Sequence, residues 1–245
     1  MAISIVSTLQ ERGRIDQDHL ANSFATKYDS GRGYGPAMHK LLAEIRHKPG
    51  CWREEAQALF NGQGSFGNGS AMRVAPLGAY FADDLDQIPE QASLSAETTH
   101  CHPEAVSGAI AVALAAAEAW RARQAGELPT RSEFLARIAA RCPESVVRRG
   151  IETAASLPSE TSIEEAVRTL GNGRIVSCPD TVPFALWSAA GHLSSYEDAL
   201  WATVQGLGDR DTTCAIVGGI VVMYVGVEGI PKSWLKAREA FPSLS

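Results

Sequence analysis

The sequence contains no alternating runs of polar and apolar residues, no closely spaced cysteine pair and no excess of positive charge. Half-buried strands alternate polar and apolar positions, so the missing alternation argues against a β-rich fold. The five cysteines are widely spaced, which fits neither a disulfide framework nor a zinc site and favours a reducing, cytoplasmic location. The formal net charge of -6 makes nucleic acid an unlikely partner, because binding its phosphates requires uncompensated Lys and Arg.

Long apolar runs are also missing, so no membrane-spanning or secretory segment is expected. Residues 1–9 carry no basic region and are followed by polar residues, which is untypical of a signal peptide. The most apolar later stretch, residues 214–227, contains three glycines and is shorter than the ~20 residues that cross a bilayer. The sequence therefore predicts a soluble protein without a membrane partner.

Apolar residues recur instead at the three- and four-residue spacing of helices. Hydrophobic residues make up 45% of the chain and charged residues 20%, which is enough to bury one large core. Because no repeat, low-complexity tract or long linker marks a boundary, residues 1–245 are expected to form one compact, all-α, multi-helix domain. Helices are expected at the start of the chain and at residues 18–28, 36–47, 53–60, 70–81, 85–96, 103–124, 130–141, 143–157, 163–170, 179–193, 196–204, 209–227 and 231–240.

A glycine-rich segment, residues 61–69, separates two of these expected helices, with glycine at four of its nine positions. Glycines let backbone N–H groups approach an anion, and the following helix presents its positive end, so the segment is a candidate cradle for a phosphate or pyrophosphate. Its Gly62-x-Gly64-x-x-Gly67 spacing matches a dinucleotide fingerprint, but that motif follows a strand and this one follows a predicted helix. An ordinary interhelical turn is the remaining alternative.

Two carboxylates and two hydroxyls cluster where the last long apolar helix is expected to begin. Asp209, Asp211 and Thr212 carry the hard oxygen ligands that magnesium prefers. A residue at the helix cap is not yet helical, so these three side chains can converge. The alternative is structural: Asp209 is the N-cap, and Asp211 is an acid favoured in the first turn by the helix dipole.

Together these features resemble one protein family. The strings GRGYGP at residues 31–36, GNGSAMRVAPLG at 67–78, TH at 99–100 and GDRDTT at 208–213 occur in the order and approximate spacing seen in ADP-ribosylglycohydrolases of the dinitrogenase reductase-activating glycohydrolase type. The resemblance extends over most of the chain. The second and fourth strings are specific in combination, although either alone would be only suggestive.

The resemblance implies an all-helical enzyme that uses two magnesium ions to hydrolyse the N- or O-glycosidic bond between ADP-ribose and a modified protein or small acceptor. It implies that Asp209 and Asp211 are catalytic, and that both bind metal together with Thr212. It further implies that the phosphates and ribose of ADP-ribose contact His100 and the loop residues Ser65, Phe66, Gly67, Asn68 and Gly69. For His100 the alternative is a packing or capping role, which is common for a lone histidine near a helix end.

One departure from the family bears on activity. Family members carry a Gly-Asp-Ala segment and a Thr-Asp-Asp-Thr string that supply the other half of the metal site, and neither string occurs in this sequence. Residues 1–13 resemble the helix that follows them, so truncation just after that motif is expected. An inactive relative or a non-catalytic ADP-ribose binder is therefore the alternative to an active hydrolase. A second departure is Arg210 between the two acids, which is expected to face solvent.

Overall fold

The computed structural model describes residues 1–240, which form fourteen α-helices, two 3₁₀ helices and no β-strand. The predicted all-α class is therefore confirmed. In chain order the elements are α1 (Ala2–Arg12), α2 (Gln17–Thr26), α3 (Pro36–His47), α4 (Trp52–Gly62), η1 (Ala71–Arg73), α5 (Ala75–Tyr80), α6 (Ile88–Glu97), α7 (Pro103–Ala125), α8 (Arg131–Ala139), α9 (Val146–Ser156), α10 (Ile163–Leu170), α11 (Cys178–Gly191), α12 (Tyr196–Gln205), α13 (Arg210–Val225), η2 (Val227–Gly229) and α14 (Lys232–Ala237).

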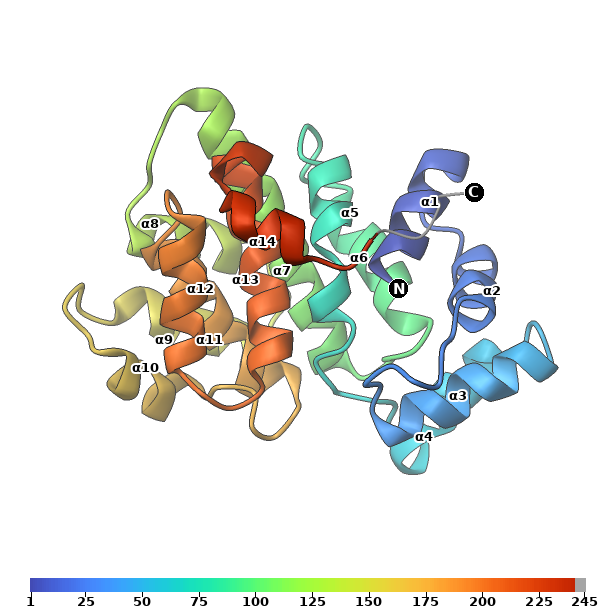
Figure 1. Ribbon diagram of the computed structural model, residues 1–245. Coiled ribbons are helices and arrows are strands. Elements are labelled where there is room, and N and C mark those ends of the chain that lie inside the picture. The colour runs from blue at the N-terminus through green and yellow to red at the C-terminus, as the bar shows by residue number, and fades with distance from the viewer. Residues whose placement is uncertain (241–245) are drawn as a thin grey trace.

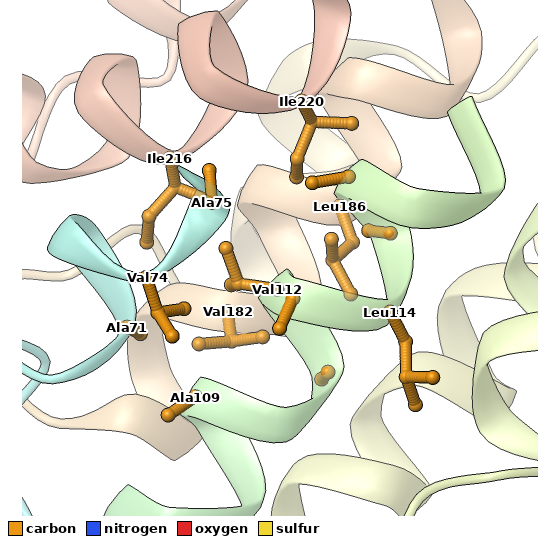
Figure 2. Close-up of a cluster of buried hydrophobic side chains, with 14 of the residues drawn as sticks. Ala71, Val74, Ala75, Ala109, Val112, Leu114, Val182, Leu186, Ile216 and Ile220 are labelled. Atoms are coloured by element: carbon orange, nitrogen blue, oxygen red, sulfur yellow. The ribbon is translucent and has the colours of Figure 1, made fainter. Parts of the chain in front are cut away.

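Helix α7 is the centre of the fold, and α5, α6, α11 and α13 pack around it (Figure 1). Its alanine-rich sequence favours helix, and its small side chains let neighbouring helices approach from several sides. Figure 2 shows apolar side chains gathered around Val112 of α7, among them Val74, Val182 from α11 and Ile216 from α13. By length and composition α7 also qualifies as a membrane span, but 83% of its apolar window is buried inside the protein, as in a core helix.

A smaller apolar cluster lies between α2, α3 and α4, on the right of Figure 1. Met38 and Leu41 of α3 pack there with Trp52 and Ala56 of α4. Tyr34, in the loop before α3, packs against both this cluster and the main core. The aromatic side chain thus connects the two apolar regions.

Most predicted helices occur within a few residues of their expected bounds, and α3 and α10 match them fully. The exception is the single helix expected at residues 70–81, where the structure has the short turn η1 followed by α5. Pro76 lies in the first turn of α5. Because proline has no backbone N–H, it cannot donate the hydrogen bond that would continue a helix from η1. The prediction of one continuous helix was wrong at this point.

Candidate functional site

Three loops meet near the N-terminal end of α7, at the lower edge of Figure 1. They are residues 63–70, 171–177 and 206–209. The first two are joined by an isolated antiparallel bridge between Gly67 and Ser177. The second and third are joined by a hydrogen bond from the Asp209 N–H to the Asn172 carbonyl, 3.1 Å long. The predicted glycine-rich segment and the predicted acidic helix start thus lie in one region, although more than a hundred residues separate them in the sequence.

The glycine-rich segment is a loop because the backbone leaves the helical conformation before it. Phe60 and Asn61 have φ values of 53° and 58°, in the left-handed region that disfavours side chains. Gly64 is required for two reasons. Its φ is 72°, and an added Cβ would lie 3.0 Å from both the Cys101 Cβ and the His102 backbone nitrogen. Leu59 already has non-helical dihedral angles, so α4 unwinds close to Phe60, where the predicted helix ends.

Two other glycines of the loop lie directly on the imidazole of His100. A Cβ at Gly69 would approach the His100 Nε2 to 3.1 Å, and one at Gly67 would approach it to 3.4 Å. The buried Ser65 hydroxyl accepts a 3.2 Å hydrogen bond from the Gly67 N–H and so shapes the turn. These contacts explain the glycines by close packing. Whether Ser65, Gly67 and Gly69 also contact a ligand stays a prediction.

Phe66 presents its side chain at the surface of the same loop, with 39% of it exposed. Its ring centroid lies 6.2 Å from that of Phe60 and 5.5 Å from that of His102. The Phe66 carbonyl accepts a hydrogen bond from the Cys178 N–H, 3.1 Å long, which fixes the loop against the start of α11. The backbone of Phe66 is therefore anchored, while its ring is available to a ligand.

His100 lies beneath the loop and is only 4% exposed. Its Nδ1 lies 2.7 Å from the Thr99 hydroxyl. Burial lowers the pKa of His100 to about 3, and the nearby Arg73 guanidinium acts in the same direction. The imidazole is therefore neutral at physiological pH. This position supports a packing role, and the ligand contact implied by the family resemblance stays a prediction.

A stability measurement as a function of pH tests the state of His100. The pKa of this residue is about 3 in the folded protein and about 6.5 when unfolded, so below pH 6.5 the unfolded chain binds a proton that the folded one does not. The contribution of His100 to stability is therefore lost as the pH falls from 6.5 toward 3, by up to about 1.4 kcal/mol per pH unit. Urea unfolding at pH 7, 6 and 5 should show the difference between wild type and His100→Asn narrowing. His47→Asn, at the exposed end of α3, is the control, and a constant difference for His100→Asn would contradict the assignment.

The Asp209 side chain is not a helix cap. Asp209 occupies the N-cap position of α13, but its side chain makes no capping hydrogen bond. Its Oδ2 instead accepts a 2.8 Å hydrogen bond from the Nδ2 of Asn68, which also donates to the Thr181 hydroxyl at 3.0 Å. Asn68 is 3% exposed. Asp209 and Asp211 thus occupy the N-cap and first-turn positions of the structural alternative, but the Asp209 side chain does not cap the helix, and the buried amide of Asn68 connects the glycine-rich loop to the acidic helix start.

Asp209 and Asp211 lie within hydrogen-bond reach of each other. Burial and then the hydrogen bond with Asp211 raise the pKa of Asp209, while the same hydrogen bond lowers the pKa of Asp211. The two carboxylates therefore titrate as an interacting pair, in which burial holds a proton on Asp209 more tightly than on a solvated carboxylate. Hydrogen bonds from Asn68 and the buried Thr212 oppose the increase at Asp209. The structure thus brings Asp209, Asp211 and Thr212 together, in an arrangement that a cation would stabilise.

The oxygen atoms of these three residues fit one magnesium ion. Magnesium is commonly held by one or two carboxylates and completes its coordination with water or substrate oxygens. In the part of the chain that the structure describes, no group of three or more His, Cys, Asp or Glu side chains forms a further metal site. Two carboxylates balance the charge of one divalent ion, so the described residues do not by themselves fit the two ions of the family. Arg210 is exposed, as expected, and does not line the adjoining cleft.

An open cleft of about 560 Å³ lies beside the carboxylates, a volume within the usual range for small-molecule sites. Val176 and Leu207 line it with exposed fractions of 57% and 62% and φ values of 57° and 56°. Strained, exposed side chains of this kind cluster at functional sites. The lining residues are Asn172, Gly173, Arg174, Val176, Leu207, Gly208, Asp209 and Asp211. Of these, the sequence analysis indicated only Asp209 and Asp211. The Gly-Asn-Gly string at residues 171–173 is typical of a turn and is the sequence signal that could have indicated the loop of residues 171–177.

A second cavity, of about 390 Å³, lies between α8 and α11 and shares no residue with the first. No carboxylate lines it. Its charged residue, Arg131, stacks its guanidinium over the Trp187 ring at 4.2 Å. Without a carboxylate this cavity offers no anionic ligand to a magnesium ion, so we assign the candidate site to the cleft at Asp209.

Comparison with known proteins identifies similar sequences and a similar fold. The sequence model of the ADP-ribosylglycohydrolase family matches residues 1–244. ADP-ribosylhydrolase ARH3 from Bos taurus is 30% identical, with 98% of this chain and 73% of that protein aligned, and ARH3 from Homo sapiens is 28% identical with the same coverage. A chain in a solved structure described as an ADP-ribosylglycohydrolase-related protein complex has the same fold, with a TM-score of 0.65 and 23% identity over 97% of this chain and 74% of that one.

Proposed function

The chain belongs to the ADP-ribosylglycohydrolase family, a family of glycoside hydrolases, and on that premise we propose that it hydrolyses the N- or O-glycosidic bond between ADP-ribose and a modified protein or small acceptor in the presence of Mg²⁺. The observation that carries this proposal is the Asn68–Asp209 hydrogen bond, which joins the glycine-rich loop to the acidic pair beside the cleft. Anion-binding and cation-binding elements thus lie next to each other, as a pyrophosphate linked to a ribose requires.

Each part of the site has a separate task in this proposal. Residues Ser65 to Gly69 receive the pyrophosphate, because backbone N–H groups of a glycine-rich loop suit an anion. Asp209, Asp211 and Thr212 hold one Mg²⁺ through their oxygens. When bound, the ion supplies electrostatic stabilisation of developing charge and orientation of oxygen ligands. The exposed side chains of Val176 and Leu207 border the cleft where the acceptor would lie.

The bond that breaks joins the anomeric carbon of the distal ribose to a nitrogen or oxygen of the acceptor. Water forms the new carbon–oxygen bond and loses a proton, which the carboxylate pair of Asp209 and Asp211 accepts. The leaving nitrogen or oxygen takes up a proton from solvent, and the carboxylate pair returns its proton to solvent, so the products are free ADP-ribose and the unmodified acceptor.

Free ADP-ribose is expected to bind more tightly than AMP in the presence of Mg²⁺. AMP lacks the second phosphate and the distal ribose, so it cannot contact the loop and the cation site together. Isothermal titration calorimetry with both ligands, with Mg²⁺ and again with EDTA, measures the difference. AMP binding should be insensitive to EDTA. No heat from millimolar ADP-ribose with folded protein would remove both the enzymatic proposal and a binding-only one.

A second candidate function is ADP-ribose binding without turnover. The observation that favours it is that the candidate cation site has two carboxylates and that no larger group of metal-ligating side chains occurs among residues 1–240, which supports one divalent ion better than two. Release of ADP-ribose from a modified protein, followed over time in Mg²⁺, distinguishes the two functions. Tight binding of ADP-ribose with no release would indicate the binding function, and catalytic release would indicate the hydrolase.

A further inference from the structure

Asn172, in the turn before α11, makes an unusual set of contacts with the loop that carries Asp209. Its Nδ2 donates to the Gly206 carbonyl at 2.9 Å, and its Oδ1 accepts from the Arg174 N–H at 3.3 Å. Its own carbonyl accepts the Asp209 N–H at 3.1 Å. One residue therefore holds both ends of the 206–209 loop and orders its own turn. Asparagine is suited to this role because its side chain donates and accepts at once.

The two loops touch backbone to backbone. A Cβ at Gly208 would lie 2.3 Å from the Asn172 carbonyl oxygen, and one at Gly173 would lie 2.7 Å from the Asp209 Cβ. Both glycines also have positive φ, 64° and 85°. No side chain can be inserted between the loops without displacing one of them. A displacement of Asn172 is therefore transmitted directly to Asp209.

We propose that Asn172 is a positioning residue that holds the Asp209 carboxylate against Asn68 at the cation site. The magnesium part of this proposal rests on the proposed function. A positioning role can be distinguished from a contribution to the stability of the whole fold. All three hydrogen bonds of Asn172 lie within or between the two turns, and none of them joins the helical core. Loss of the side chain should loosen residues 206–213 selectively.

The test compares Asn172→Ala with Asn22→Ala, a control at an exposed position on α2. Hydrogen–deuterium exchange of the unliganded proteins measures the protection of residues 206–213, and of α7 as an internal reference. Calorimetric titration of the folded proteins with Mg²⁺ measures the cation affinity. We expect faster exchange at 206–213 with unchanged exchange in α7, and a Mg²⁺ affinity lower by roughly 10- to 100-fold, the usual effect of removing a group that orients a metal ligand. Asn22→Ala should match the wild type in both measurements.

Asn172→Asp provides a second variant of the same size, in case the alanine protein does not fold. It keeps an acceptor oxygen for the Arg174 N–H but cannot donate to the Gly206 carbonyl, so it should raise exchange at residues 206–213 as the alanine variant does. Only exchange is compared for this variant, because its added carboxylate is itself a type of group that binds Mg²⁺. Unchanged exchange at 206–213, or exchange that rises equally in α7, would overturn the proposal. A wild type that binds no Mg²⁺ would refute the magnesium part of the proposed function, whereas the exchange comparison would still decide the role of Asn172.

Discussion

Replacement of Asp209 by alanine is expected to abolish the increase in melting temperature that Mg²⁺ gives the wild-type protein, and Asp211→Ala is expected to do the same. Each variant removes one of the two carboxylates that face the cleft, and the remaining Thr212 hydroxyl carries no charge to replace it. A ligand that binds only the folded state stabilises it by about 2.7 kcal/mol at one hundred times its dissociation constant. Loss of most of the affinity removes most of that stabilisation.

Thermal unfolding with increasing Mg²⁺, with Ca²⁺ in parallel, measures this effect. Asp83→Ala is the matched control, because Asp83 is an exposed aspartate that does not line the cleft. Asp209→Asn is the isosteric variant, and it separates loss of charge from loss of shape. Equal Mg²⁺-induced shifts in wild type, Asp209→Ala and Asp211→Ala would show that the cation site lies elsewhere.

Gly78→Ala is expected to cause the largest loss of stability among single-methyl additions in this protein. Gly78 lies on α5 where that helix crosses α7, and an added Cβ would lie 2.0 Å from the carbonyl oxygen of Ala113 and 2.8 Å from its carbon. The obstacle is the backbone of the central helix, which cannot rotate away as a side chain would. Overpacking typically lowers the free energy of unfolding by about 1–3 kcal/mol, and a decrease of about 3 kcal/mol or more is expected at this contact.

The sign of the change in stability distinguishes tertiary packing from local helix propensity. In an exposed helix, replacement of glycine by alanine stabilises by about 1 kcal/mol, so a local propensity argument predicts the opposite sign. Urea unfolding gives the free energy of each variant. Gly33→Ala is the control, because a Cβ there meets no atom within 4 Å. A Gly78→Ala protein as stable as the wild type would mean that α5 and α7 do not pack this closely.

Local pattern determined the class of the fold and most of its helices. Apolar spacing along α3 and α10, and the alanine content of α7, are properties of consecutive residues. The i to i+4 hydrogen bonds of a helix also join near neighbours, so short windows of sequence contain the information. The break between η1 and α5 also has a local cause, Pro76, which the apolar pattern concealed. The strings around Asn68 and Asp209 were sufficient to indicate the family, and the family match confirms that inference.

The tertiary structure decided which of those residues lie together and what each of them contacts. The residues around Asp209 in the sequence are typical of a helix cap, yet its carboxylate accepts a hydrogen bond from Asn68, which is 141 positions away in the chain. His100 reads as a possible ligand contact, yet it is buried beneath Gly67 and Gly69. The role of Asn172 depends on a loop more than thirty residues further along the chain. These properties depend on how distant segments pack around α7, and the packing of many helices at once is not encoded in any short stretch of the sequence.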